Sequence, residues 1–381
     1  MTRQMRQLAA KDRRARSYCR GPMVEPESPP DGLPSDAAPP DVLLADEDRA
    51  GLLRHMLLMR VIEERGISLY KQGRIPGSFY DGRGQEAISV GATWAMSAAD
   101  PVCSPLIRDL GAHLVRGTCI SDIFRHYMGR ENPISRGREG NVHFGDRRKG
   151  VVGMVSMLPD MVVVAVGLAM AFQMRDEERC ALTFFGDGAT SRGDWHEAMN
   201  WAGLNRLAVV LVFENNGFAY STPSHQQFAI DPAIRAAGYG IEAFRVDGND
   251  VEAVFAAAHH ARRRALAGEG PTLIEAMTMR MHGHGAHDDA QYVPADLREH
   301  WAQRDPIARY TATLQARGVD TSAIADEVAG TVAAAVDEAL KTPMADPSHA
   351  TEGVYCENEP ESLGEGAAPW SGFSPALALP A

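Results

Sequence analysis

The sequence predicts an α/β fold: a mostly parallel sheet with helices on both faces. Two patterns support this prediction. Between about residues 160 and 280, short apolar segments typical of strands alternate with longer segments of helical period. The apolar segments, such as LAVVLVF at 207–213, are nearly continuous rather than alternating. Strands of that kind are buried on both faces, as the strands of a parallel sheet are.

The expected elements follow in chain order. Asp46 or Asp48 can cap a first helix whose apolar residues recur with helical period up to Gly73. Residues 101–150 are interrupted by Gly and Pro, and GRENPISRGREGNVHFGDRRKG predicts a functional or disordered loop. We expect further helices over 85–96, 162–174, 194–202, 251–267 and 323–340, and strands over 181–185, 207–213, 243–246 and 272–279.

Three regions are expected along the chain. Residues 1–44 include a Pro-rich stretch with few large apolar residues, which predicts a disordered N-terminal extension. Residues 45–341 are expected to form the folded domain. Residues 342–381 are polar and rich in Pro and Gly, so we expect a weakly ordered tail.

Composition excludes several classes of protein. A net charge of -12 argues against a nucleic-acid surface, which needs clustered Lys and Arg. No run of about 18 apolar residues is present, so we expect no membrane span. The five cysteines lack paired spacing, which predicts neither a disulfide framework nor a cysteine zinc site and makes a reducing cytoplasm the simplest location.

Polar residues follow two of the expected strands. Gly186-Asp187-Gly188 ends one, and Asn215-Asn216 ends the next. Because the carboxyl ends of neighbouring parallel strands lie side by side, Asp187 and Asn216 are expected to converge. Carboxylate, carboxamide and backbone oxygens suit Mg²⁺, and the glycines let a diphosphate approach the backbone. A lone GDG is more often a tight turn, but the paired asparagines favour a ligand site.

GDG followed by NN resembles the thiamine-diphosphate motif. The segments ENNGFAYSTP, GYGIEAFRVDGNDVEAV, PTLIEAMT and MRMHGHGAHDD are similar to the alpha subunit of the decarboxylating component of 2-oxo acid dehydrogenase complexes, especially the branched-chain and acetoin branches. The resemblance covers about residues 45–340. It implies the thiamine-diphosphate-binding fold, its diphosphate-binding half, with thiamine diphosphate and Mg²⁺ as cofactors.

The resemblance also implies the roles of single residues. Mg²⁺ would be bound by the side chains of Asp187 and Asn216 and by the carbonyl of Phe218, where the family usually has Tyr. The remaining cofactor-binding residues would be Arg108 and Arg280 at the diphosphate, Ser156 at the aminopyrimidine, Leu158 as the wedge under the bent cofactor, and Gly188, Ala189 and His284. Ile107 replaces a family Tyr beside Arg108, which removes one hydroxyl contact.

The stretch RMHGHGAHDD at 280–289 holds three histidines and two carboxylates, a pattern that could form a zinc site like that of the metallo-β-lactamases. The family resemblance instead implies that His284 is catalytic at the mouth of the cofactor channel, with His143 as a second candidate. His282 and His287 would then be structural. Gly285 stands where mitochondrial members carry a regulatory serine, so that phosphorylation switch is absent.

The implied activity is oxidative decarboxylation of a 2-oxo acid, branched-chain or pyruvate, with acyl transfer to lipoamide on a separate acyltransferase subunit. The chain lacks a second thiamine-type half, so a separate beta subunit is expected to complete the site in an α2β2 heterotetramer. Two alternatives stay open: the alpha subunit of an acetoin dehydrogenase or carboligating thiamine enzyme, and a non-catalytic assembly subunit.

Overall fold

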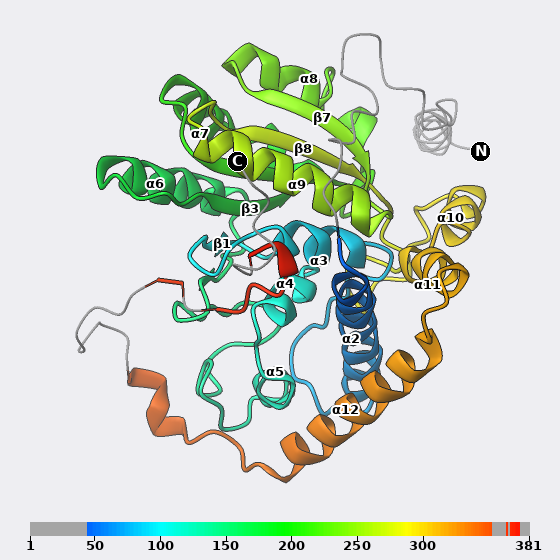
Figure 1. Cartoon of the computed structure of the whole chain (residues 1–381). Helices are drawn as coiled ribbons and strands as arrows, with labels where there is room; N and C mark the ends of the chain where they lie inside the picture. Colours follow the sequence, from blue (N-terminus) through cyan, green and yellow to red (C-terminus); the bar gives the residue numbers. More distant parts are fainter. Residues whose placement is uncertain (1–43, 353–362, 365, 374–381) are drawn as a thin grey trace, which may run out of the picture.

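The computed structural model describes residues 44–352, 363–364 and 366–373. Its main sheet has six strands in the order β2-β1-β3-β4-β8-β7, and every neighbouring pair is parallel (Figure 1). These strands are β1 Val102–Cys103, β2 Val151–Val152, β3 Ala181–Gly186, β4 Val209–Asn215, β7 Glu242–Asp247 and β8 Thr272–Met277. The expected α/β class with a mostly parallel sheet is confirmed. A separate antiparallel hairpin joins β5 Phe218–Ala219 to β6 Thr222–Pro223.

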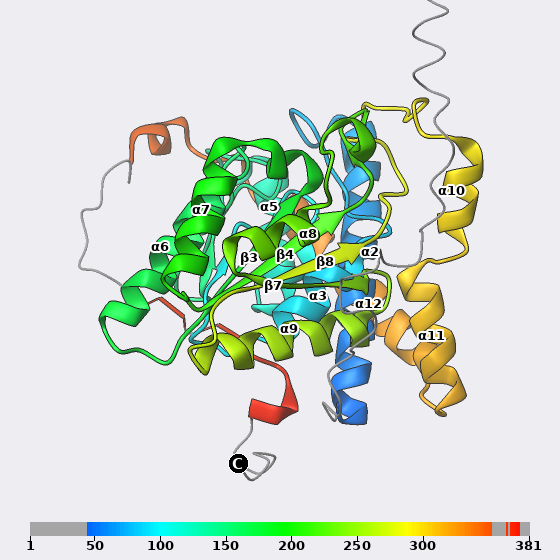
Figure 2. The same ribbon diagram turned by 90° about the horizontal axis from the view of Figure 1, so that it is seen from above.

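Helices cover both faces of this sheet. One face packs against α3 Glu86–Trp94 and α9 Val251–Leu266, and the other against α6 Asp160–Met174 and α7 Gly193–Leu204. Side chains along a strand alternate between faces. Accordingly, in β3 the side chains of Leu182 and Phe184 join one core and those of Ala181 and Phe185 join the other. Figure 2 shows α9 and α7 on opposite sides of the strands.

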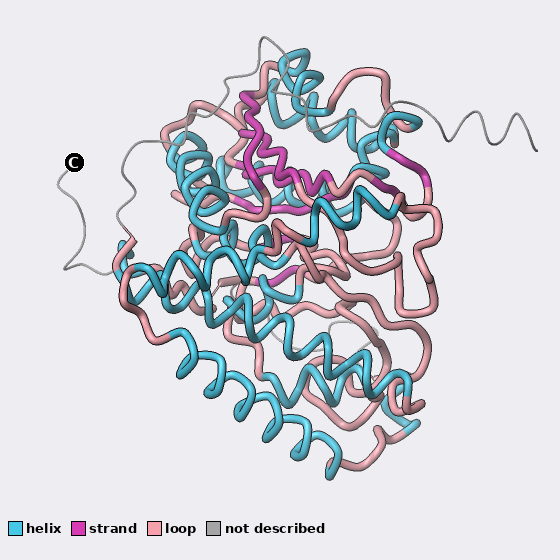
Figure 3. The backbone as a smooth tube through the Cα atoms, turned by 90° about the vertical axis from the view of Figure 1, so that its right-hand side faces the viewer, coloured by secondary structure: helices cyan, strands magenta, loops and turns pink. Residues whose placement is uncertain are grey.

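A second layer of helices lies outside the first. The long helix α2, Asp46–Lys71, packs against α12, Thr321–Lys341, which also contacts α5, Ile120–Tyr127 (Figures 1 and 3). The remaining described α-helices are α4 Leu110–Val115, α8 Pro232–Ala236, α10 Ala295–Ala302 and α11 Pro306–Ala316. Helices α4, α5, α8, α10 and α11 were not expected from the sequence. None of the described helices is both long and apolar enough to cross a membrane.

Of the two predicted disordered or weakly ordered ends, the C-terminal one includes a described segment that contacts the domain. The predicted disordered extension, residues 1–44, lies outside the described residues except for Leu44. Part of the C-terminal tail also lies outside them. Within the described segment 366–373, the ring of Trp370 contacts the rings of Phe255 and His259 on α9, with centroids 5.3 and 4.7 Å apart. The backbone N–H of Ser371 donates to Asp48 Oδ1 at 2.7 Å, which ties this segment to the start of α2.

Candidate functional site

The ends of β3 and β4 place the two residues with candidate metal-binding side chains at the same edge of the sheet. Gly186 is paired with Glu214 in the register of the two strands, so Asp187 and Asn216 both follow at the carboxyl edge of the sheet. Both residues are buried. This register is the reason why Asp187 and Asn216, 29 positions apart in the sequence, follow strands that end next to each other.

Asp187 is tied to the loop that follows β4. Its Oδ2 accepts hydrogen bonds from Ser224 Oγ at 3.1 Å and Gln227 Nε2 at 3.0 Å, and its Oδ1 accepts from the Gly188 N–H at 2.9 Å. Burial raises the pKa of Asp187, although these hydrogen bonds and the charge of Arg280 act in the opposite direction. A cation bound here would favour the carboxylate form.

Asn216 and Phe218 present the other two candidate ligands. Asn216 Oδ1 accepts the backbone N–H of Phe218 at 3.2 Å, and Asn216 Nδ2 donates to Gln85 Oε1 at 3.0 Å. The carbonyl of Phe218 accepts a long contact of 3.4 Å from Arg280 Nη1. A carboxylate, a carboxamide and a backbone carbonyl thus lie along one edge, which is the oxygen donor set that Mg²⁺ prefers.

Gly188 and Ala189 form the turn after β3. A Cβ at Gly188 would lie 2.8 Å from the Cβ of Ala219, so the close approach of the β5–β6 hairpin requires glycine here. Ala189 is buried beneath the turn. At Gly186 a Cβ would meet nothing within 4 Å, which leaves room beside the backbone.

Arg108 and Arg280 are buried cations whose hydrogen bonds go to carbonyl and hydroxyl oxygens. Arg108 donates to the carbonyls of Asp81 and His284, both at 2.6 Å. Arg280 donates to the hydroxyl of Tyr292 at 2.7 Å and to the carbonyl of Tyr220. Among the described residues neither guanidinium lies within ion-pair distance of a carboxylate, although the charges of Asp81, Glu214 and Glu63 act on Arg108 from farther away. Two buried positive charges of this kind fit a multiply charged anion.

Two further features support this fit. The Nε of Arg280 is buried and has no hydrogen-bond partner among the described residues. Burial, and then the positive charge of Arg280, lower the pKa of Arg108. Two guanidinium groups that repel each other in a buried place would both be stabilised by a diphosphate between or beside them.

His284 lies next to these arginines. Its Nδ1 is 3.4 Å from Arg108 Nη2, and its ring contacts Tyr220 and Tyr80 with centroids 4.5 and 5.4 Å apart. Burial, Arg108 and Arg280 lower the pKa of His284 to about 4. The imidazole is therefore neutral near pH 7. Its backbone N–H donates to Asp288 Oδ2 at 2.6 Å, which links the two ends of the loop.

His143, Ser156 and Leu158 are linked by hydrogen bonds; the Leu158 N–H donates to the carbonyl of Ser156 at 3.0 Å. His143 Nε2 forms a hydrogen bond of 2.7 Å with Ser156 Oγ, although 13 positions separate the two residues. Ser156 is exposed and Leu158 is partly buried. The contact with Ser156 brings His143 to the loop that precedes α6.

The other histidines of RMHGHGAHDD have separate partners. His282 Nδ1 is 2.7 Å from Asp81 Oδ2, whereas the His287 ring faces Tyr80 at 6.3 Å between centroids. No group of three His, Cys, Asp or Glu side chains in the described residues is arranged to hold a metal ion. The three histidines therefore have different contact partners. They do not form the zinc site that their spacing in the sequence allowed.

Four site residues were not found from the sequence. Gln85 contacts Asn216, Tyr292 contacts Arg280, and Ser224 and Gln227 contact Asp187. A weak signal existed for Gln85, because RGQE combines a glycine-rich turn with the first residue of a helix. Tyr292 and the two residues after the hairpin carried no pattern that distinguishes them from ordinary loop residues.

Comparison with known proteins agrees with this geometry. Residues 54–352 match the family model of the dehydrogenase E1 component. The chain is 36% identical to the 2-oxoisovalerate dehydrogenase subunit alpha of Bacillus subtilis, over 82% of this chain and 97% of that protein. It is 34% identical to the pyruvate dehydrogenase E1 component subunit alpha of Rhizobium meliloti, over 79% and 88%. It is also 36% identical to the 3-methyl-2-oxobutanoate dehydrogenase subunit alpha of Mycobacterium tuberculosis, over 78% and 79%. The chain belongs to the family of dehydrogenase E1 components.

Proposed function

We propose that this chain is the alpha subunit of a thiamine-diphosphate-dependent 2-oxo acid dehydrogenase. It would catalyse the oxidative decarboxylation of a branched-chain 2-oxo acid or pyruvate, with transfer of the acyl group to lipoamide. The observation that carries the proposal is that the buried Arg280 lies beside the oxygen donors that follow β4, with a second buried arginine, Arg108, close enough to repel it. Membership of the dehydrogenase E1 family supports it.

The cofactor would be held by residues at the carboxyl edge of the sheet. Asp187, Asn216 and the carbonyl of Phe218 would hold Mg²⁺, and Arg108 and Arg280 would hold the diphosphate. Ser156 and Leu158 lie in the loop before α6, and the family resemblance assigns them contacts with the aminopyrimidine and the bend of the cofactor. Bound thiamine diphosphate supplies the nucleophilic carbon and the electron sink that decarboxylation of a 2-oxo acid requires.

The chain itself would manage protons and orientation. His284 is neutral near pH 7, so one ring nitrogen can accept a proton and the other can donate one. Its place beside Arg108 suits an imidazole that orients the carboxylate of the substrate. His143 would be the second catalytic histidine, in a position held by its hydrogen bond with Ser156.

The site would be completed by other subunits. The three relatives compared above are all named as alpha subunits. We therefore propose a separate beta subunit, joined in an α2β2 heterotetramer, that supplies the carboxylate needed to activate the aminopyrimidine. A lipoyl-bearing acyltransferase subunit would receive the acyl group. On this proposal the isolated chain has no turnover.

The test is co-expression of the chain with a beta subunit of the same family from the same organism. Decarboxylation of pyruvate and of 3-methyl-2-oxobutanoate should depend on added thiamine diphosphate and Mg²⁺, with an artificial electron acceptor in place of lipoamide. The variant Asp187→Asn, purified as the same complex, should lose this activity. Absence of activity on both acids in the intact complex, or full activity of the isolated chain, would contradict the proposal.

A further inference from the structure

Gln85 is a fully buried residue whose carboxamide is hydrogen-bonded at both ends. It lies directly before α3 and contacts Asn216, one of the candidate metal ligands. Its Nε2 donates to Glu214 Oε2 at 3.2 Å, and its Oε1 accepts from Asn216 Nδ2 at 3.0 Å. Gln85 therefore links the last buried carboxyl group of β4 to the candidate metal ligand two positions further along the chain.

The direction of these hydrogen bonds fixes which atom of Asn216 faces the metal position. A carboxamide carries its donor and its acceptor on different atoms, so a rotation by 180° exchanges them. The oxygen of Gln85 engages Asn216 Nδ2, which turns Asn216 Oδ1 to the opposite side. The Phe218 N–H donates to that oxygen at 3.2 Å, an independent contact that agrees with the same orientation. Only the oxygen of a carboxamide is a suitable ligand for Mg²⁺.

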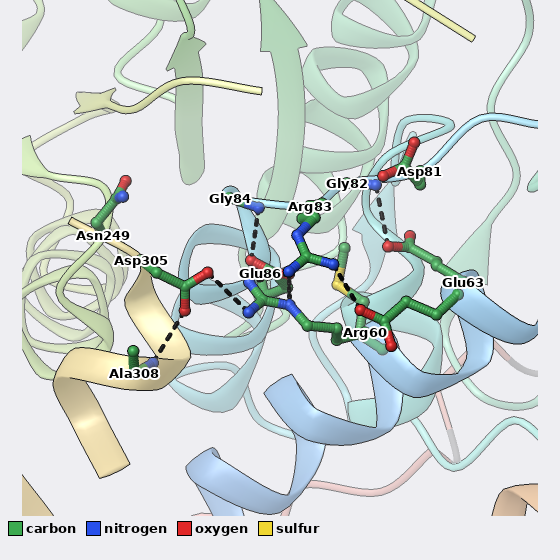
Figure 4. Close-up of polar contacts among 12 residues, drawn as sticks. Arg60, Glu63, Asp81, Gly82, Arg83, Gly84, Glu86, Asn249, Asp305 and Ala308 are labelled. Carbon is green, nitrogen blue, oxygen red and sulfur yellow. Dashed lines mark hydrogen bonds and ion pairs between the residues drawn. The ribbon is translucent and has the colours of Figure 1, made fainter. Parts of the chain in front are cut away.

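The backbone around Gln85 is firmly held. The Gln85 N–H donates to the carbonyl of Gly82 at 2.8 Å, and the Gly84 N–H donates to Glu86 Oε2 at 2.9 Å. Glu86 is itself buried in an ion pair with Arg60 at 2.6 Å. Figure 4 shows Glu86 between Gly84 and Arg60 below this loop. Because its side chain is also fully buried and its Nε2 is bound to Glu214 Oε2, Gln85 has little freedom to turn with Asn216 if the asparagine amide rotates.

Gly84, next to Gln85, allows the loop to approach the backbone of Met279 closely. Gly84 has a φ of +96°, and a Cβ there would lie 2.4 Å from the carbonyl oxygen of Met279. Thr278 Oγ1 donates to the Gly84 carbonyl at 3.0 Å. The loop around Gly84 therefore packs tightly against the residues that follow β8 and lead to Arg280.

We propose that Gln85 is a positioning residue that holds the carboxamide of Asn216 with its oxygen toward the Mg²⁺ of bound thiamine diphosphate. The inference rests on the proposed function, because it assigns Gln85 to the same metal site. Gln85 touches neither metal nor substrate on this account. It acts through Asn216, and its contribution is confined to the part of cofactor affinity that depends on the metal.

The first test is Gln85→Leu in the complex with the beta subunit. Thiamine diphosphate is titrated calorimetrically with Mg²⁺ and again in EDTA. Partners that orient a metal ligand typically contribute 10- to 100-fold to metal affinity. We therefore expect the affinity measured with Mg²⁺ to fall about 10- to 100-fold and the affinity in EDTA to change less than about twofold. Equal losses under both conditions would show a general distortion of the site and would overturn the proposal.

A donor–acceptor exchange provides the matched control. In the double variant Gln85→Glu with Glu214→Gln, the new glutamate offers acceptors to both neighbours, and the new glutamine supplies the donor that Gln85 has lost. Asn216 Nδ2 keeps an acceptor. The double variant should recover most of the metal-dependent affinity that Gln85→Leu loses. A double variant no better than Gln85→Leu, with a thermal midpoint equal to that of the wild type, would overturn the proposal.

The outcomes separate this inference from the proposed function. If the wild-type complex binds thiamine diphosphate no more tightly with Mg²⁺ than in EDTA, the metal site itself is wrong and the inference falls with it. If the wild type shows the metal effect and Gln85→Leu keeps it in full, only the role of Gln85 is refuted.

Discussion

Replacement of Arg280 by methionine tests the anion site most sharply. Arg280 is buried and donates to the Tyr292 hydroxyl and two backbone carbonyls, with its Nε unpartnered. Methionine keeps much of the buried stem and removes the charge. A hydrogen bond to a charged group contributes about 1.5–3 kcal/mol, so thiamine diphosphate should bind roughly 10- to 150-fold more weakly.

Ligand binding converts this loss into a measurable change in stability. At a concentration 100 times its Kd, a ligand stabilises the native state by about 2.7 kcal/mol. If the Kd rises about 100-fold, the same concentration contributes only about 0.4 kcal/mol. The assay is thermal unfolding of the complex with the beta subunit, with and without Mg²⁺ and thiamine diphosphate. Removal of Arg280 also relieves its repulsion of Arg108, which offsets part of the lost hydrogen bonding in the cofactor-free protein.

Arg116 supplies the matched control. It is equally buried and also donates to backbone carbonyls, those of Ser97 at 2.9 Å and Asp100 at 2.6 Å, but it contacts none of the candidate site residues. Arg116→Met should lower the stability of the cofactor-free protein and leave the stabilisation by cofactor intact. The reasoning is refuted if Arg280→Met behaves in the same way, since Arg280 would then be a structural arginine.

Three further predictions concern single residues. Gly188→Ala places a Cβ 2.8 Å from the Cβ of Ala219 and should lower the free energy of unfolding by about 1–3 kcal/mol in urea titrations. In Gly186→Ala the new Cβ meets no atom within 4 Å, so the free energy of unfolding should change by less than about 0.5 kcal/mol. Equal effects of the two substitutions would contradict the packing argument. The pKa of His284 is lowered to about 4, so below about pH 6.5 the unfolded chain binds a proton that the native state does not, and stability falls as the pH drops from about 6.5 to 4. His284→Gln should flatten that part of the curve of unfolding free energy against pH, and an unchanged slope would refute the assigned pKa. His143→Gln should lower kcat about 100-fold or more in steady-state assays of the complex and leave the affinity for thiamine diphosphate within about twofold; a loss confined to affinity would make His143 a binding residue.

The central sheet could be predicted because its strands are nearly continuous apolar runs. The segment 207–213 became β4 at Val209–Asn215, and 181–185 became β3 at Ala181–Gly186. The register of these two strands places Asp187 and Asn216 at the same edge of the sheet. Strand order along a parallel sheet is a strong constraint, so residues at strand ends can be placed together without coordinates.

The short helices could not be predicted in the same way. In α10, Ala295–Ala302, only Trp301 is buried, so the segment has no apolar period to recognise. Helix α11, Pro306–Ala316, did carry a signal: Asp305 caps it through the Ala308 N–H at 2.9 Å, and Pro306 occupies its first position. The contact of Gln85 with Asn216 joins residues 131 positions apart and depends on tertiary packing that no local pattern records.

The most direct test of the whole account is a titration of thiamine diphosphate into the complex of this chain with its beta subunit, with Mg²⁺ and in EDTA, for the wild type and Asp187→Asn. We predict tight binding by the wild type only when Mg²⁺ is present, and an affinity for Asp187→Asn that is the same with Mg²⁺ as in EDTA. Tight binding by Asp187→Asn that still depends on Mg²⁺ would place the metal elsewhere and contradict the account.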